Sequence, residues 1–285
     1  KDLMKSILSF TGWNLLNSVS ALAIVQFKGI FLNMFFGVNL NAAEGIAKQA
    51  SSQVNLVSVN MTRALNPQVM KSEGSGNRRR MLYLTGLGTK FSIFLFSLIA
   101  IPIFYEAPFL LNLWLKEVPD YAVIFFQITL IAAVFEKMTF EITTAIRAVG
   151  VIRKFQIIET SVLLMNIPIY YVVLKAGYPP YSIYITSIVV SLIGAYVRLY
   201  FGEKIAGLTK RLYFKNSISP VMLTIFSSCM VAFLPQLFMQ ESALRTFIVF
   251  SLSISTMAFT FWFWGLDINE KAKVRQLLIS VKQKI

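Results

Sequence analysis

Histidine is absent from this sequence, and cysteine occurs once, as Cys229. Without histidine, catalytic triads and zinc sites that depend on an imidazole are excluded. A single cysteine forms no disulfide within the chain and provides no metal-ligand spacing. The sequence also lacks a P-loop and a glycine-rich dinucleotide fingerprint. It therefore predicts no ATP hydrolysis, no redox chemistry, no metal site, no cofactor and no catalytic residue, so an enzyme is not expected.

Charged residues are also scarce. They make up 14% of the chain, against about 25% in soluble domains, while 56% of the residues are hydrophobic and the mean hydropathy is +0.66. A helix needs roughly 20 apolar residues to cross a bilayer. Eight stretches reach that length, over residues 10–36, 42–66, 81–105, 121–146, 155–175, 181–202, 218–239 and 244–266. The sequence predicts an all-α, polytopic bundle of transmembrane helices.

The few charges are unevenly distributed. Lysine and arginine outnumber aspartate and glutamate by 27 to 13. The cations are divided among short connections and form no single basic face, so no nucleic-acid partner is expected. Most lie at the N-terminus, on every second connection and in the tail, whereas the alternate connections hold Lys116, Lys175 and Arg245. By the positive-inside rule, both ends of this chain are expected in the cytoplasm.

The spacing of the apolar stretches suggests a domain organisation. We expect a cytoplasmic segment over residues 1–9, six spans over 10–202, a basic cytoplasmic loop over 203–217, two additional spans over 218–266 and a tail over 267–285. The tail combines cations with Leu277, Leu278 and Val281, which suits an amphipathic segment on an anionic leaflet. Because the chain starts with Lys1, close to the first span, we expect it to be the later part of a longer protein.

The first span carries a polar stripe. It consists of small and polar residues at helical spacings of three and four, namely Asn14, Asn17, Ser18, Ala21, Val25 and Lys28. A lysine near the bilayer centre costs about 2.5–3.5 kcal/mol on insertion scales, so such a cation normally faces a bundle or a hydrated cavity. The stripe predicts a polar cavity wall. The alternative is that Lys28 extends along its own helix toward the membrane surface.

The second span has one polar face. Glu44, Lys48, Ser52, Asn55 and Arg63 lie along it. Polar groups inside a membrane usually line a functional cavity, so we expect this face to meet the stripe of the first span. The alternative is a structural ion pair between Glu44 and Lys48, which are four residues apart in the favoured order.

The fourth span holds three charged residues near its middle, Glu136, Lys137 and Glu141. Lys137 and Glu141 are four residues apart and are expected to pair. Glu136 is then left without a local partner, which makes it the main candidate for carrying a coupling H⁺ or Na⁺, with Glu141 as a second candidate. The alternative is that Glu136 forms a structural ion pair with Lys90 or Arg198. Pro168, beside Asn166, is expected to interrupt the fifth span.

Residues 37–67 resemble the paired helices that open the second lobe of polysaccharide flippases, which belong to the multidrug, oligosaccharidyl-lipid and polysaccharide exporter superfamily. The residues that carry the resemblance are Gly37, Ala42, Ala43, Gly45, Ala47, Ala50, Ser51, Arg63, Ala64 and Pro67. They are followed by Met70, Lys71 and the run Arg78 to Arg80. Later features fit too: Pro102 in a span, then Leu113, Trp114 and Leu115, and a turn at Gly150 before Arg153.

The resemblance implies two six-helix bundles in the bacterial cytoplasmic membrane, often with two further helices, that transport by alternating access. Spans over residues 10–202 would form the second bundle, and the first bundle would be a partner missing from this chain. The cargo would be an O-antigen-type oligosaccharide on undecaprenyl diphosphate, a precursor of lipopolysaccharide. Its diphosphate would contact cations such as Lys28, Lys48 or Arg63.

Three other functions remain open. A multidrug exporter of the same superfamily would favour acidic cavities for cationic drugs. A membrane-embedded glycan polymerase or acyltransferase would be expected to carry a large external loop, whereas the loop between the third and fourth spans is short and holds Glu106, Lys116, Glu117 and Asp120. A purely structural membrane subunit would leave the polar faces of the first two spans unexplained.

Overall fold

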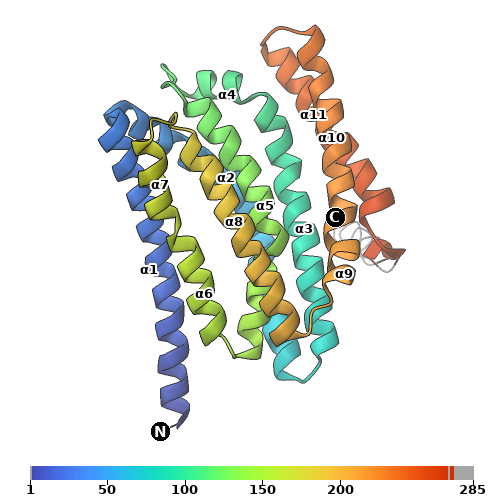
Figure 1. Cartoon of the computed structure of the whole chain (residues 1–285). Coiled ribbons are helices and arrows are strands. Elements are labelled where there is room, and N and C mark those ends of the chain that lie inside the picture. Colours follow the sequence, from blue (N-terminus) through green and yellow to red (C-terminus); the bar gives the residue numbers. More distant parts are fainter. Residues whose placement is uncertain (1, 269, 273–285) are drawn as a thin grey trace.

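The computed structural model describes residues 2–268 and 270–272, with the side chains of 2–10, 13 and 14 left out of the description. Within these residues every regular element is helical (Figure 1). The long helices are α1 (Asp2–Phe36), α2 (Val38–Gly74), α3 (Arg78–Tyr105), α5 (Ala122–Val149), α6 (Arg153–Leu164), α7 (Asn166–Lys175), α8 (Ser182–Phe201), α10 (Ser219–Phe238) and α11 (Ala243–Thr260). Shorter elements are α4 (Ala107–Trp114), α9 (Lys210–Tyr213) and three π-helical turns, η1 (Gly202–Ala206), η2 (Phe214–Ile218) and η3 (Phe261–Gly265).

The expected all-α membrane bundle is confirmed. In the described part of the chain, seven helical segments are long and apolar enough to cross a membrane. They correspond to seven of the eight predicted spans. The eighth, over residues 42–66, lies within α2, which is too polar to be counted with the others but has 37 residues, a length of about 55 Å. Because α2 packs between α1, α3 and α5, it belongs to the same bundle.

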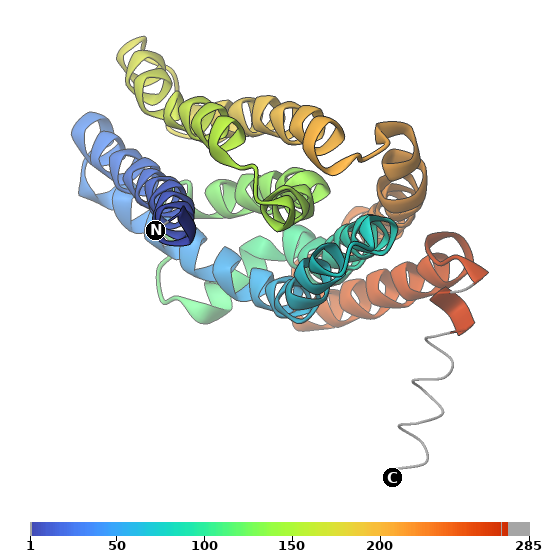
Figure 2. The ribbon, with the colours of Figure 1, turned by 90° about the horizontal axis from the view of Figure 1, so that it is seen from below.

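Helix α5 lies at the centre of the first six spans. It packs against α2, α3 and α8, while α1 packs on α2, α6 and α7 at one edge (Figures 1 and 2). The hairpin of α10 and α11 lies on the opposite side and contacts α3. Large buried side chains of α5, such as Phe125, Leu130 and Ile142, join the core clusters at the two ends of the bundle. Helix α2 therefore lies between α1 and the central helix α5.

The predicted interruption of the fifth span is confirmed. The helix divides into α6 and α7 around Met165, and Pro168 lies in the first turn of α7. Proline has no N–H to donate to the preceding turn, so the helical ladder loses a bond there. Close to the break, the side chain of Asn166 donates from Nδ2 to the carbonyl of Leu163 at 2.8 Å.

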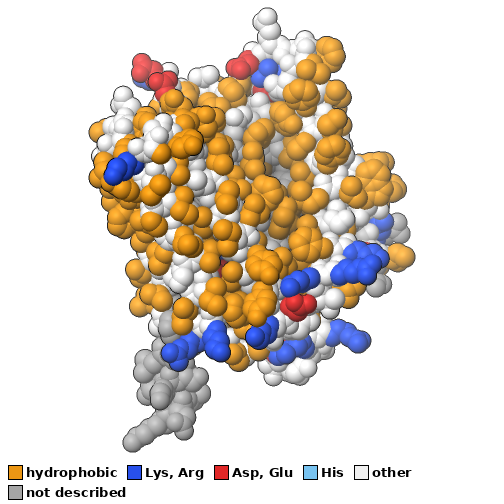
Figure 3. Space-filling model, in the orientation of Figure 1, with side chains coloured by type: hydrophobic (Ala, Val, Ile, Leu, Met, Phe, Trp, Pro, Cys, Tyr) orange, Lys and Arg blue, Asp and Glu red, His pale blue; other side chains and the backbone are white. Residues whose placement is uncertain are grey.

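Basic residues collect at one end of the bundle. The turns from α2 to α3 and from α5 to α6, together with the segment between α8 and α10, lie at this end (Figure 1), and Figure 3 shows Lys and Arg there below a broad hydrophobic band. In the first turn, Gly76 takes φ 75°, and Asn77 caps α3 by accepting from the N–H of Arg80. Arg78 donates to the Glu73 carboxylate and holds its pKa below the usual range.

Several predicted boundaries differ from the structure. Residues 2–9, expected as a cytoplasmic segment ahead of the first span, are helical and continue into α1. The connection after the third span contains α4, and the basic loop over 203–217 is largely made of η1, α9 and η2. In both connections, apolar residues such as Leu111 and Tyr213 are buried against the bundle, which stabilises local helix. The predicted amphipathic tail lies mostly outside the described residues.

Gly202 provides a test of how tightly α5 and the end of α8 approach each other. A Cβ at Gly202 would lie 2.6 Å from Cγ2 of the fully buried Ile142. Gly202→Ala is therefore expected to destabilise the protein by about 1–3 kcal/mol. Gly194 is the matched control, because a Cβ there meets nothing within 4 Å, and alanine in a helix interior is favoured by about 0.5–1 kcal/mol.

Unfolding of the two detergent-purified variants would be compared by thermal scan. A Gly202→Ala protein as stable as Gly194→Ala would contradict the close packing of α5 on η1.

Candidate functional site

A polar crevice opens between α1, α2 and α5. Its cavity volume is about 270 Å³, and Tyr184 of α8 forms part of its wall. Four of the predicted cargo-binding residues line it, namely Lys28, Lys48, Ser52 and Asn55, together with Glu136 from the predicted coupling pair. Lys28 lies eight residues before the end of α1, about 12 Å along the helix axis and so within a hydrocarbon layer of roughly 30 Å.

Lys28 is held inside the crevice. Its Nζ lies 3.2 Å from Oε1 of Glu44 and 4.3 Å from the centre of the Tyr184 ring. Gly29 allows this approach of α1 to α2, because a Cβ there would lie 3.3 Å from Oε2 of Glu44. The alternative in which Lys28 extends toward the membrane surface is therefore wrong. So is the alternative pair of Glu44 with Lys48, since the carboxylate binds a cation on the neighbouring helix.

Lys48 and Glu136 are the exposed charges of the crevice. Among the described residues neither has an ion-pair partner within 4 Å. The structural ion pairs of Glu136 with Lys90 or Arg198 do not form. Lys90 pairs with Glu270 at 2.8 Å instead, and Arg198 pairs with Glu159 at 2.6 Å. Glu136 thus keeps a free carboxylate facing a polar cavity, as the coupling-ion hypothesis requires.

Below the crevice, a polar seam joins α5 to α2. Lys137 donates to Oδ1 of Asn55 and to Oγ of Ser58, each at 2.6 Å, and Thr62 donates to Glu141 at 3.0 Å. The predicted ion pair between Lys137 and Glu141 is wrong, because each side chain turns to neutral partners on α2 instead. Asn55 connects the seam to the crevice, since its side chain lines the cavity and also accepts from the buried ammonium.

The other predicted residues lie elsewhere. Arg63 is exposed two turns beyond Asn55 on α2 and does not line the crevice. Asn17 and Ser18 lie on α1 away from the cavity wall, and the side chain of Asn14 is outside the described part of the chain. Glu141 is 3% exposed and bound to Thr62, so the cavity does not reach it.

Three polar residues of the crevice were not predicted as site residues from the sequence: Tyr184, Ser51 and Thr129. Serine, threonine and tyrosine are common in transmembrane helices, so these residues did not stand out in the sequence. The hydroxyl of Ser51 donates a hydrogen bond to the carbonyl of Ala47 on the same helix. Tyr184 is buried, and its hydroxyl has no hydrogen-bond partner in the described residues. A buried hydroxyl without a protein partner can accept or donate a hydrogen bond to a water molecule or to a polar ligand.

Asn55→Ala tests the link between seam and crevice. The substitution removes one of two acceptors from a Lys137 ammonium that is 9% exposed. A hydrogen bond to a charged group contributes about 1.5–3 kcal/mol, so we expect a loss of stability in that range. Ser52→Ala is the control, because Ser52 lies one turn away and, within the described residues, its hydroxyl bonds only to the Gln49 carbonyl of its own helix. Equal unfolding temperatures for the two variants would contradict the role of Asn55.

The crevice combines charged and neutral polar groups. It presents two ammonium groups, two carboxylates, hydroxyls and an amide, and the described residues contain no cluster of metal-ligating side chains. Lys28 and Lys48 suit a phosphate-bearing group, while serine, threonine and asparagine suit sugar hydroxyls. In comparisons with known proteins, no family model matches the chain, and neither a curated protein nor a solved structure is significantly similar to it.

Proposed function

We propose that this protein is a lobe of a flippase that moves a lipid-linked oligosaccharide across the bacterial cytoplasmic membrane by alternating access. The observation that carries the proposal is the crevice within the spanning region, where Lys28 and Lys48 face a cavity with hydroxyl and amide groups. A diphosphate forms strong charge-assisted hydrogen bonds with ammonium groups. The undecaprenyl chain of such a cargo would stay in the lipid while its headgroup enters the crevice.

A second lobe is part of the proposal. The exposed face of α2 carries Lys48, Ser52 and Arg63, and acyl chains offer no partners for such groups. A polar surface of this kind in a membrane is covered by protein or by water in a cavity. A second helical bundle facing α1 and α2 would close the crevice and leave a central path for the cargo. Both ends of this chain would then lie in the cytoplasm.

A cation-coupled multidrug exporter is the second candidate. Glu136 favours it, because an exposed carboxylate in a membrane crevice can bind a cationic drug as well as a coupling ion. The two functions differ in the charge of the cargo, which is negative for a lipid-linked oligosaccharide and positive for a cationic drug. Lys28 neutralises Glu44, so the remaining free charges are Lys48 and Glu136, and the hydroxyl-rich wall is what favours a glycan.

The test is a flipping assay with the full-length protein in liposomes. Fluorescent undecaprenyl diphosphate oligosaccharide is placed in one leaflet, and its exposure on the other is followed by a membrane-impermeant lectin. We expect exposure to rise with protein and to fall when Lys48 is replaced by methionine. The same replacement of Lys175, at the end of α7 and outside the crevice, should leave the exposure unchanged. Uptake of a cationic dye without any flipping would instead favour the exporter.

A further inference from the structure

An apolar groove lies between α3, α5 and α10, apart from the crevice. Its volume is about 290 Å³. Both cavities use the same part of α5, over residues 129–136, but different faces of it. Leu130 and Val134 line the groove, whereas Thr129 and Glu136 line the crevice. None of the residues proposed to bind cargo lines the groove.

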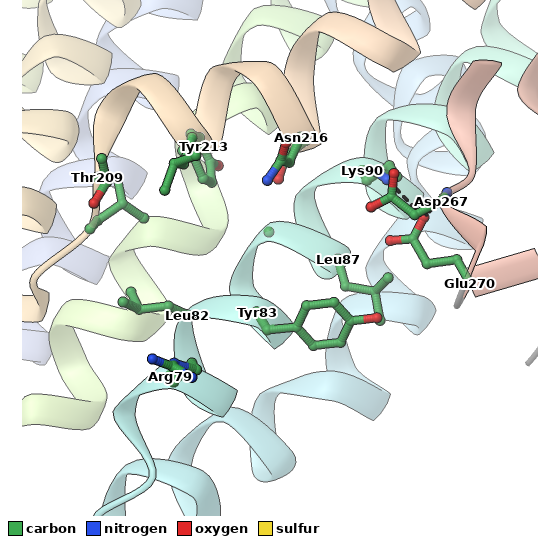
Figure 4. Close-up of a pocket in the computed structure, with 14 residues that line it drawn as sticks. Arg79, Leu82, Tyr83, Leu87, Lys90, Thr209, Tyr213, Asn216, Asp267 and Glu270 are labelled. Atoms are coloured by element: carbon green, nitrogen blue, oxygen red, sulfur yellow. Dashed lines mark hydrogen bonds and ion pairs between the residues drawn. The ribbon is translucent and has the colours of Figure 1, made fainter.

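Ion pairs hold the α10–α11 hairpin and the segment after it on α3, at the two ends of this groove. Nζ of Lys90 lies 2.8 Å from Oε2 of Glu270, which follows η3 (Figure 4). Arg245 of α11 donates to Glu106, directly after the end of α3. These two levels are about 24 Å apart along α3, and the groove runs along residues 97–105 between them. The groove is the space that side chains leave unfilled between the two ion pairs.

The lining of the groove is uncharged. Among the described residues that line it, Ser97, Tyr105 and Cys229 are the only ones whose side chains carry oxygen or sulfur. Ser97 and Tyr105 lie about 12 Å apart along α3, and a thiol is a weak hydrogen-bonding group. A buried water makes about three hydrogen bonds. The groove therefore favours an uncharged, apolar occupant over water or an ion.

The groove is continuous with the lipid-facing surface of the bundle. Leu130 is 2% exposed, whereas Ile131, the next lining residue, is 40% exposed. The helices α3, α5 and α10 all belong to segments that are long and apolar enough to cross a membrane, and such segments are surrounded by acyl chains. Hydrocarbon is therefore the material that meets the open side of the groove.

We propose that the groove holds one hydrocarbon chain of a membrane phospholipid, packed between α5 and α10 as part of the folded protein. The walls of an empty apolar groove lose the van der Waals contacts that an occupant provides, and a flexible chain of methylene groups restores them. Because no charged residue lines the groove, the site selects the chain and not the headgroup.

The test measures retained lipid, and none of the residues that it alters lines the crevice, so it is independent of the proposed function. The full-length protein is delipidated in detergent and offered equal amounts of phosphatidylethanolamine and phosphatidylglycerol with identical acyl chains. Bound lipid is counted by native mass spectrometry. We expect the unaltered protein to retain one phospholipid that groove-filling variants lose, with either headgroup in equal amounts.

Two variants fill the groove from different helices. Ile225→Trp on α10 and Ile131→Trp on α5 each place an indole at the lining, and Ile131 is exposed enough that its replacement leaves the core intact. Each should lower retention of this lipid at least about tenfold, because emptying about a fifth of such a volume changes an equilibrium by roughly that factor. Leu223→Trp is the matched control, since Leu223 lies on α10 outside the groove and is 56% exposed.

A phospholipid with a diazirine in its acyl chain locates the occupant. Adducts are expected within residues 97–105, 130–135 and 225–229. Retention of no lipid, equal retention by Leu223→Trp and both groove variants, or a headgroup preference in the lipid that these variants lose would each overturn the proposal. So would adducts confined to other segments, or a dimer that forms without bound lipid and is lost in the groove variants, since a second copy would then cover the groove.

Discussion

Replacing Glu106 with alanine is expected to lower the free energy of unfolding by about 3–5 kcal/mol, because it leaves a buried arginine without its counter-charge. Glu106 is fully buried at the junction of α3 and α4, and Arg245 of α11 is 5% exposed. The guanidinium donates to both carboxylate oxygens, from Nε at 3.1 Å and from a terminal nitrogen at 3.2 Å. This is among the largest stability effects that the structure predicts.

The carboxylate of Glu106 also binds two neutral groups of the hairpin. Gln236 of α10 donates from Nε2 at 2.6 Å, and Thr246 of α11 donates from Oγ1 at 2.9 Å. The bonds of Glu106 to Gln236, Arg245 and Thr246 join the α10–α11 hairpin to the end of α3. The ion pair of Lys90 with Glu270, which follows η3, makes a second connection to α3. We expect the hairpin to move with the first six spans as one body.

Glu117→Ala is the control for this prediction, because Glu117 lies in the same connection but is exposed and unpaired in the described structure. Unfolding of each variant in detergent, followed by tryptophan fluorescence, gives the comparison. The double variant Glu106→Leu with Arg245→Leu should recover most of the loss, because removing both charges leaves no uncompensated ion. Equal stability of Glu106→Ala and Glu117→Ala would show that the cluster contributes nothing.

The spans could be predicted from the sequence because they depend on composition. Apolar runs of about 20 residues and the alternation of basic connections need no knowledge of packing. The break at Pro168 was predictable for a similar reason, since proline lacks the donor that a helix interior needs. The polar face of α2, by contrast, was predicted from helical spacing. Because α2 contains many charged and polar residues, it is not among the seven helices that are apolar enough to be identified as spans.

The pairing of charges could not be predicted. Sequence distance suggested Glu44 with Lys48 and Lys137 with Glu141, because residues four apart are neighbours on a helix. The structure pairs Glu44 with Lys28 and gives Lys137 to Asn55 and Ser58. Within a bundle, a charged side chain can pair with a residue on an adjacent helix instead of a residue on its own helix. Which pair forms depends on interhelical distances, and a single sequence does not contain these distances.

The second large effect is expected on transport. Lys28→Met should lower the rate of flipping in the liposome assay roughly 10- to 100-fold, since the loss of a charge-assisted hydrogen bond of about 1.5–3 kcal/mol changes an equilibrium by that factor. In addition, Glu44 loses its partner at 3.2 Å and becomes a free carboxylate in the crevice. A free carboxylate repels a diphosphate, so both changes act in the same direction.

Two explanations of such a loss are separated by a second substitution. If Lys28 only neutralises Glu44, then Lys28→Met combined with Glu44→Gln restores both the stability and the flipping, because no charge is left unpaired. If the ammonium also binds cargo, the double variant regains stability but stays slow, since the diphosphate still lacks its donor. Lys175→Met, at the end of α7 and outside the crevice, is the control. Rapid flipping by the double variant would remove Lys28 from the cargo site and leave Lys48 as the cation of the crevice.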